Sequence, residues 1–125
     1  MEQRQFGFEK LTVWQAARQY SKEIYSLTKL FPKEEMYGLT SQIQRAAVSV
    51  SSNIAEGSGR TGVKDQLKFY GIAYGSLLET ISQLFLALDL GYIAKEDIDQ
   101  LRPLADTISA RLSVLCNSLQ SKINE

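Results

Sequence analysis

The strongest constraint on the fold is the spacing of the apolar residues, which recur every three or four positions through most of the chain. This period matches the 3.6 residues per turn of an α-helix, whereas a half-buried strand would alternate apolar and polar residues. Two prolines, Pro32 and Pro103, and a few glycine-rich turns punctuate the pattern. The sequence therefore predicts four helices, over about residues 8–31, 39–58, 63–90 and 95–122.

The first and last segments each carry one apolar seam. The expected core residues of the first are Leu11, Trp14, Ala17, Ile24, Tyr25, Thr28 and Phe31, and those of the last are Ile98, Leu101, Ala105, Ile108, Leu112, Leu115 and Leu119. Pro32 ends the first helix because its ring disfavours helical geometry at the preceding residue. We expect a kink or break at Pro103, since proline removes a backbone donor inside the last helix.

The second segment is a helix with two different sides. One side is apolar and is expected in the core: Leu39, Ile43, Ala46, Ala47, Val50 and Ile54. The other side carries Gln42, Arg45, Ser49, Ser52, Glu56 and Arg60, a row that is either ordinary solvent-facing surface or a place of close helix packing. Its short side chains favour packing, because a wet helix face usually carries longer lysine, glutamate and glutamine.

The end of this helix, the run GSGRTG, offers a candidate phosphate loop beside a plainer interpretation. The run lacks the GxxxxGK[ST] order and follows a helix rather than a strand, so a helix cap beginning at Gly57 is the better interpretation. Glu56 is expected to pair with Arg60 one turn on, or with Arg45 across an interface. Asn53 is expected to satisfy backbone groups near the helix end.

The third segment is apolar on two faces. Its core stripe is predicted to be Leu67, Tyr70, Tyr74, Leu77, Leu78, Ile81, Leu84, Phe85 and Leu88. A second row contains Ser76, Glu79 and Gln83 and is apolar at both ends, at Phe69, Ile72, Leu86 and Leu90. Because large apolar patches are unusual on soluble monomers, these four residues are the candidate interface of a homo-oligomer.

The residue types present exclude several classes of chemistry. The 125 residues contain no histidine and one cysteine, Cys116, which removes the commonest general base and any zinc site built from these two residue types. We therefore expect no enzyme, no metal and no cofactor. One domain in the cytoplasm is the expectation, because no stretch is apolar for the roughly 20 residues of a membrane span.

The charge distribution gives a limited signal for nucleic acid. Lysine and arginine balance aspartate and glutamate at 14 each, but residues 1–68 hold ten basic against seven acidic side chains. A local field rather than net charge guides a polyanion. The candidate phosphate-binding residues are Arg18, Lys22, Arg45, Arg60, Lys64 and Lys68, and the alternative is that they are plain solvated surface.

Several blocks of the chain resemble one known family. These are FEKLTVWQAA at 8–17, LTKLFPKEEMYGLTSQIQRAAVSVSSNIAEGSGR at 27–60, IAYGSLLETISQL at 72–84 and LGYI at 90–93. The chain is similar to the four-helix-bundle proteins of 23S rRNA intervening sequences, also called S23-type ribosomal proteins, whose central pattern is QIRRAAVSIPSNIAEG. Gln44 stands in place of an arginine of that pattern and Ser51 in place of its proline.

The resemblance implies an up-and-down antiparallel bundle that assembles into a ring, typically a homopentamer, in bacterial cytoplasm. It marks Gln42, Arg45, Asn53, Glu56 and Gly57 as signature residues and makes structured RNA, such as rRNA, a candidate partner. A related bundle is the accessory variability protein of diversity-generating retroelements. The alternative function is therefore a protein-interaction scaffold, or an accessory subunit of an enzyme such as a reverse transcriptase, without nucleic-acid specificity of its own.

Overall fold

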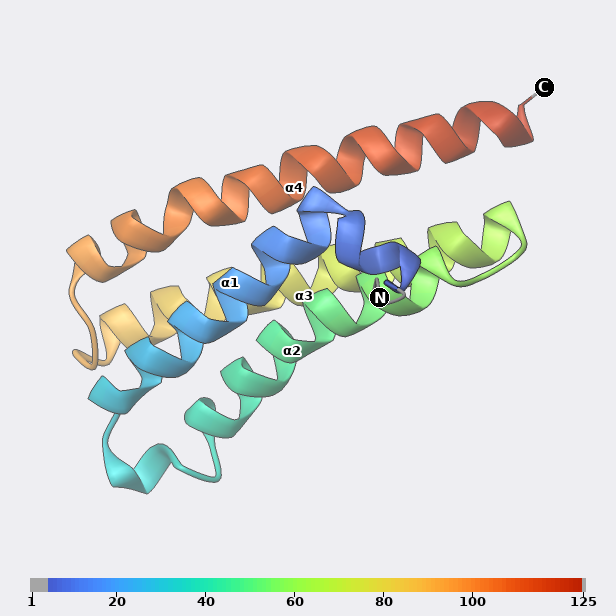
Figure 1. Ribbon diagram of the computed structural model, residues 1–125. Helices are drawn as coiled ribbons and strands as arrows, with labels where there is room; N and C mark the ends of the chain where they lie inside the picture. Colours follow the sequence, from blue (N-terminus) through green and yellow to red (C-terminus); the bar gives the residue numbers. More distant parts are fainter. Residues whose placement is uncertain (1–4, 125) are drawn as a thin grey trace.

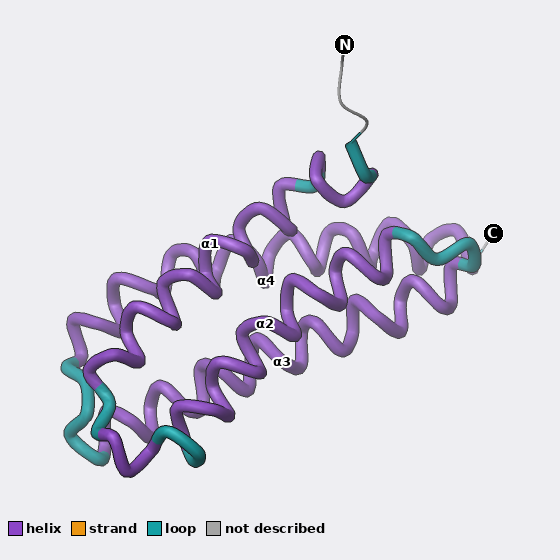
Figure 2. Tube along the Cα trace, turned by 60° about the horizontal axis from the view of Figure 1, so that its bottom comes forward, coloured by secondary structure: helices purple, strands orange, loops and turns teal. Residues whose placement is uncertain are grey.

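The computed structural model describes residues 5–124 and contains four long helices. They are α1 (Thr12–Leu27), α2 (Leu39–Ser58), α3 (Val63–Asp89) and α4 (Lys95–Ile123). Three short 3-10 helices, η1 (Gly7–Lys10), η2 (Thr28–Leu30) and η3 (Lys33–Glu35), flank α1 and lead into α2. Successive long helices run in opposite directions, and α1 and α3 each pack against both α2 and α4 (Figures 1 and 2). Residues 5–124 contain no strand, and the predicted all-α up-and-down bundle is confirmed.

The core fills the space between the four helices. All six residues that the sequence places on the apolar side of the second helix are buried. Tyr20 of α1 is fully buried, and its hydroxyl lies 2.7 Å from Thr80 Oγ1 of α3. Because Thr80 donates to the carbonyl of Leu77 at 2.6 Å, it accepts from Tyr20, so both buried hydroxyls are satisfied. Burial raises the pKa of Tyr20, which keeps the phenol neutral in the core.

The first helix is shorter than the predicted 8–31. Its first turn is the separate helix η1, in which the Glu9 carboxylate accepts from the Phe6 backbone N–H at 2.6 Å. Leu11 then adopts an extended conformation, with φ −74° and ψ 119°, which separates η1 from α1. Tyr25 was predicted in the core but is 45% exposed, because the buried side of α1 is the narrower arc through Ala17 and Ile24.

The sequence predicts a kink or a break at Pro103, and the break is wrong, since α4 continues through this residue. Pro103 and Asp99 are both exposed, so the Asp99 carbonyl that lacks a helical donor can bind water instead. Thr107 Oγ1 donates to the Pro103 carbonyl at 3.0 Å, one turn later. Proline therefore removes one backbone hydrogen bond on the solvent-exposed side of α4.

The predicted core stripe of α3 is only partly correct. Tyr74, Leu78 and Phe85 are exposed, although the sequence places them in the core. The buried arc of α3 instead consists of Tyr70, Ala73, Leu77, Thr80, Leu84 and Ala87. By length and composition alone α3 could cross a membrane, and 28% of its most apolar window is buried in the bundle.

The contact between α2 and α3 is made close by small residues. Ser49 Oγ of α2 lies 2.8 Å from Ser76 Oγ of α3. Near the end of α2, a Cβ atom on Gly57 would lie 2.8 Å from Tyr70 Cε1 and 3.1 Å from Phe69 Cβ. Glycine is therefore required at residue 57 because α3 occupies the space of a side chain.

One carboxylate joins the two loops at the same end of the bundle. Glu35 of η3 accepts from the backbone N–H of Leu39 at 3.1 Å and from the Tyr92 hydroxyl at 2.7 Å. The first bond caps α2, and the second reaches the loop between α3 and α4. These two hydrogen bonds hold the pKa of Glu35 below its ordinary value, and the Glu35 carboxylate raises the pKa of Tyr92.

Replacing Gly57 by alanine tests the close contact between α2 and α3. We expect Gly57→Ala to lower the free energy of unfolding by about 1–3 kcal/mol, because the added methyl group overpacks against Tyr70. Gly71→Ala is the matched control, since nothing lies within 4 Å of the position of its Cβ. It should raise stability by up to about 1 kcal/mol through helix propensity. Urea unfolding at low protein concentration measures both, and equal effects would contradict the packing argument.

Acid titration tests the role of Glu35. A carboxylate with a lowered pKa stabilises the fold above its ordinary value of 4.5, and this contribution is lost as the pH falls through the lowered pKa. Glu35→Gln should therefore be less stable at pH 7 than the wild type and lose less stability below pH 4.5. Glu34→Gln is the control, and thermal unfolding between pH 7 and 3 is the measurement. Parallel stability curves for wild type and Glu35→Gln would contradict this role.

Candidate interaction surfaces

The side chains considered for catalysis or metal binding lie apart. Glu56 is exposed and binds Arg60 at 2.6 Å, and Glu79 is exposed on α3. Within residues 5–124, no group of three or more His, Cys, Asp or Glu side chains could hold a metal ion. Burial raises the pKa of Cys116, which disfavours the reactive thiolate. These side chains give no pair of nucleophile and base.

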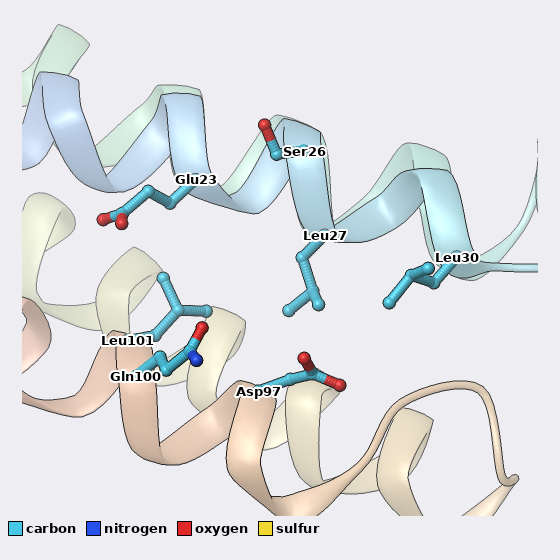
Figure 3. A pocket seen from close by; sticks show the side chains of 7 residues that line it. All are labelled: Glu23, Ser26, Leu27, Leu30, Asp97, Gln100 and Leu101. Carbon is cyan, nitrogen blue, oxygen red and sulfur yellow. The ribbon is translucent and has the colours of Figure 1, made fainter.

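An open groove lies between the end of α1 and the start of α4 (Figure 3). Its lining residues are Glu23, Ser26, Leu27, Leu30, Asp97, Gln100 and Leu101. Two carboxylates reach it from opposite helices, Glu23 from α1 and Asp97 from α4. Asp97 already accepts from the backbone N–H of Ala94 at 2.8 Å and so caps α4. Asp97 therefore serves as a helix cap, and we assign no catalytic role to the groove.

The structure brings three of the candidate basic residues to neighbouring helices. The Ser21 hydroxyl of α1 donates to the Ala47 carbonyl of α2 at 2.9 Å, which sets the two helices at the same level there. Lys22 follows Ser21 directly, and Arg45 lies two residues before Ala47. Arg18 lies one turn before Lys22 on the same side of α1. All three basic side chains are exposed, Arg45 on the side of α2 that also carries Ser49 four residues later. We call these three residues of the two helices the α1–α2 basic surface.

Aromatic residues accompany this basic surface. The Arg18 guanidinium lies over the Trp14 ring, 5.5 Å from its centroid, which restricts where the arginine can point. Tyr25 lies three residues after Lys22 and seven after Arg18, spacings that put it on the same side of the helix. The sequence pattern places Tyr25 in the core because this residue directly follows Ile24, which is a core residue. Its spacing from the two basic residues was the available signal.

The other three basic residues form a second group at the turn between α2 and α3. Arg60 is already paired, with Glu56 Oε1 at 2.6 Å and with Asp65 Oδ2 at 3.7 Å. Its guanidinium also stacks 4.6 Å from the centre of the Phe69 ring. Lys64 and Lys68 are exposed on the first turns of α3. Two carboxylates therefore compensate the charge of Arg60, and the two lysines carry most of the positive charge here.

The remaining signature residues lie along the edge of α2 that faces α3. Asn53 Nδ2 donates to the carbonyl and hydroxyl oxygens of Ser49, at 2.8 and 2.9 Å. Gln42 Oε1 lies 3.5 Å from Gln83 Nε2 of α3, a distance too long for a strong hydrogen bond. Glu56 pairs with Arg60, which lies in the turn after α2 and was one of the two expected partners. This edge contributes packing and local hydrogen bonds.

The candidate oligomer residues lie on α3 away from the core. Ile72, Leu86 and Leu90 are exposed, and Phe69 is half-buried beneath Arg60. Tyr74, Leu78 and Phe85 are also exposed, so α3 carries several large apolar side chains on its outer surface. An apolar surface of this kind is typical of an interaction site.

Comparisons with known proteins agree on the fold. The sequence model of a family described as "23S rRNA-intervening sequence protein" matches residues 9–114. A crystal structure from Bacteroides thetaiotaomicron VPI-5482, of a protein of unknown function from the S23 ribosomal protein family, superposes with a TM-score of 0.77. It is 22% identical and covers 84% of this chain and 98% of its own. No curated protein sequence gives a significant match.

Proposed function

We propose, since this chain belongs to the family of 23S rRNA-intervening sequence proteins, that it is a non-enzymatic protein that binds structured RNA in the cytoplasm. It does so as a homo-oligomer, with RNA held by the α1–α2 basic surface through phosphate contacts. The observation that carries this proposal is the Ser21–Ala47 hydrogen bond, which sets Lys22 and Arg45 at the same level on neighbouring helices.

The charges around this surface favour a polyanion. Glu23, the acidic residue next to Lys22, points into the groove beside α4 and not toward α2 (Figure 3). Glu56 of α2 is held by Arg60 at the far end of its helix. Arg18, Lys22 and Arg45 thus keep their positive charge available, and the phosphate backbone supplies most of the affinity in such complexes.

An exposed aromatic residue suits RNA better than duplex DNA. Proteins that recognise RNA loops and bulges stack unpaired bases on aromatic side chains. Tyr25 is exposed beside Arg18 and Lys22, so a base splayed from a loop could stack on its ring while the phosphates meet the cations. This arrangement favours structured RNA with unpaired bases as the ligand.

Self-association is the second part of the proposal, and it rests on α3. The exposed Ile72, Leu86 and Leu90 give this helix an apolar face that the chain's own helices do not cover. Burial of such surface drives association. Copies joined in this way would bring several basic surfaces to one RNA.

Filter-binding titrations against fragments of 23S rRNA, at salt concentrations from about 50 to 300 mM, test the RNA proposal. The logarithm of the association constant should fall linearly with the logarithm of the salt concentration. Arg18→Ala, Lys22→Ala and Arg45→Ala should each reduce this slope by about 0.7–0.9, one phosphate contact per residue. Tyr25→Ala should weaken binding while leaving the slope unchanged, since stacking involves no counterion.

Lys95→Ala is the matched control, because Lys95 is an exposed lysine at the start of α4, outside the basic surface. It should bind RNA with the wild-type affinity and slope. If the wild type retains no RNA at the lowest salt concentration, or if Lys95→Ala changes the slope as much as Lys22→Ala, the RNA proposal fails. Co-purification of one defined protein together with flat RNA titrations would favour the scaffold alternative.

A further inference from the structure

We infer that the α1 part of the basic surface belongs to a longer track, which runs along α1 and binds an unpaired strand of RNA. This inference rests on the proposed RNA binding and specifies its ligand. The track, which we call the α1 stripe, consists of four residues, all of them exposed: Arg18, Lys22, Tyr25 and Lys29. Arg45 lies on α2, outside this line, and remains a phosphate contact for the flanking RNA.

The spacing of the α1 stripe puts its members in one line. They follow one another in steps of four, three and four residues, which keep side chains on the same side of a helix, one turn apart. Lys29 lies in η2, which continues α1 without a gap. The stripe is therefore continuous, and from Arg18 to Lys29 it measures about 17 Å along the helix axis.

Two hydrogen bonds to α2 fix the direction in which the stripe faces. The Ser21 hydroxyl donates to the Ala47 carbonyl at 2.9 Å. Seven residues later, Thr28 Oγ1 accepts from the Gln44 side-chain amide at 3.0 Å. Together these bonds set which side of α1 faces α2. A lysine of the stripe directly follows each of the two hydroxyl residues, so both lysines leave α1 on the same outer side, next to α2.

The part of α2 that borders the stripe carries uncharged side chains. Gln44 bonds Thr28 of α1, and three short residues continue its line along α2 in steps of four, three and four: Val48, Ser51 and Ala55. Short side chains leave room for a strand to lie along the boundary of the two helices. The α2 side of this boundary therefore adds no charge that would repel phosphate.

The acidic residues of α1 and α2 leave the stripe uncompensated. These two helices contain two of them, Glu23 and Glu56. Glu23 lines the groove beside α4 (Figure 3), and Glu56 binds Arg60. No ion pair within residues 5–124 engages Lys22 or Lys29. The positive charge of the stripe is therefore available to phosphates, which supply most of the affinity for nucleic acid.

The aromatic ring between the two lysines selects an unpaired strand. Tyr25 is 45% exposed and lies one turn from Lys22 and one turn from Lys29. A base stacks on such a ring when it is free of a duplex, and the lysines on either side meet the phosphates before and after it. At about 3.4 Å per nucleotide of a stacked strand, the stripe accommodates about five nucleotides.

Arg18 is held in position at the start of the stripe. Its guanidinium lies 5.5 Å from the centre of the Trp14 ring, and Phe8 of η1 packs edge-on against the same ring, 4.8 Å between centres. An arginine restricted in this way loses less side-chain freedom when it binds a phosphate. Trp14 is the only tryptophan of the chain, so its fluorescence reports binding at this end of the stripe.

Fluorescence anisotropy with labelled RNA of known strandedness tests the ligand. The probes are oligouridylates of about 3, 5 and 10 nucleotides and a blunt RNA duplex of about 10 base pairs, at one low salt concentration. Affinity should rise about tenfold from the shortest to the middle strand, and only about twofold beyond it, because the stripe is then filled. The duplex should bind about tenfold more weakly than the longest strand. The strands should also change the fluorescence of Trp14.

Variants of the stripe separate stacking from general attraction to charge. Tyr25→Leu should weaken binding of the five-nucleotide strand by about tenfold and leave duplex binding unchanged. Tyr74→Leu, which removes an exposed tyrosine of α3, is the matched control and should change neither. Lys29→Ala should lower the salt slope for the single strand by about 0.7, whereas Lys95→Ala on α4 should not. Circular dichroism of every variant checks that the chain remains helical.

Three results would overturn the α1 stripe. Equal affinity for strand and duplex, with no effect of Tyr25→Leu, would exclude an unpaired ligand and leave the proposed RNA binding intact. An effect of Lys29→Ala no larger than that of Lys95→Ala would show that the track does not extend beyond the residues of the proposed function. Binding of neither the oligouridylates nor the 23S rRNA fragments at low salt would overturn the stripe and the proposed RNA binding together.

Discussion

The close contact between α2 and α3 determines how the rest of the chain is arranged. Gly57 leaves room for Tyr70, and the Ser49 and Ser76 hydroxyls meet across the same interface at 2.8 Å. Among the long helices α3 packs only against α2 and α4, so it buries a narrow arc and its remaining apolar residues face outward. In the polar row of α2, Ser49 packs against Ser76 of α3, whereas the other five residues are exposed, so the packing interpretation holds for Ser49 and the solvent-facing interpretation for the rest of the row.

The sequence predicts well where the helices lie along the chain, but it predicts poorly which of their faces contact other helices. Apolar period alone identifies four helices and the complete buried side of α2, since that helix has one apolar face. It fails for α3, which is apolar on several sides, so that Leu78 and Phe85 cannot be told from Leu77 and Leu84 without knowing where α2 and α4 lie. The break predicted at Pro103 fails for another reason. The effect of a proline on a helix depends on whether the carbonyl that loses its hydrogen bond faces water, and the sequence pattern does not show this.

The candidate surfaces show the same limit. Counting charges identifies all six basic residues, but nothing local reveals that Arg60 is held between Glu56 and Asp65 or that it stacks on Phe69. The grouping of Lys22 with Arg45 comes from a hydrogen bond between residues 26 positions apart in sequence. Contacts of this kind form only in the folded chain. The sequence therefore does not show that carboxylates compensate the charge of Arg60, whereas Lys22 and Arg45 stay unpaired in residues 5–124.

The two proposed surfaces are compatible because of the order of the helices. α1 and α3 occupy diagonal corners of the bundle, each packed against α2 and α4, so their outer faces point in different directions (Figure 1). Copies joined through α3 would leave the α1–α2 basic surface of each copy open. Two weak sites on one particle bind a long RNA more tightly than either alone when the RNA can span them. Assembly of this kind would allow a chain with no net charge to bind a polyanion, because it joins the basic surfaces of several copies without making the chain itself basic.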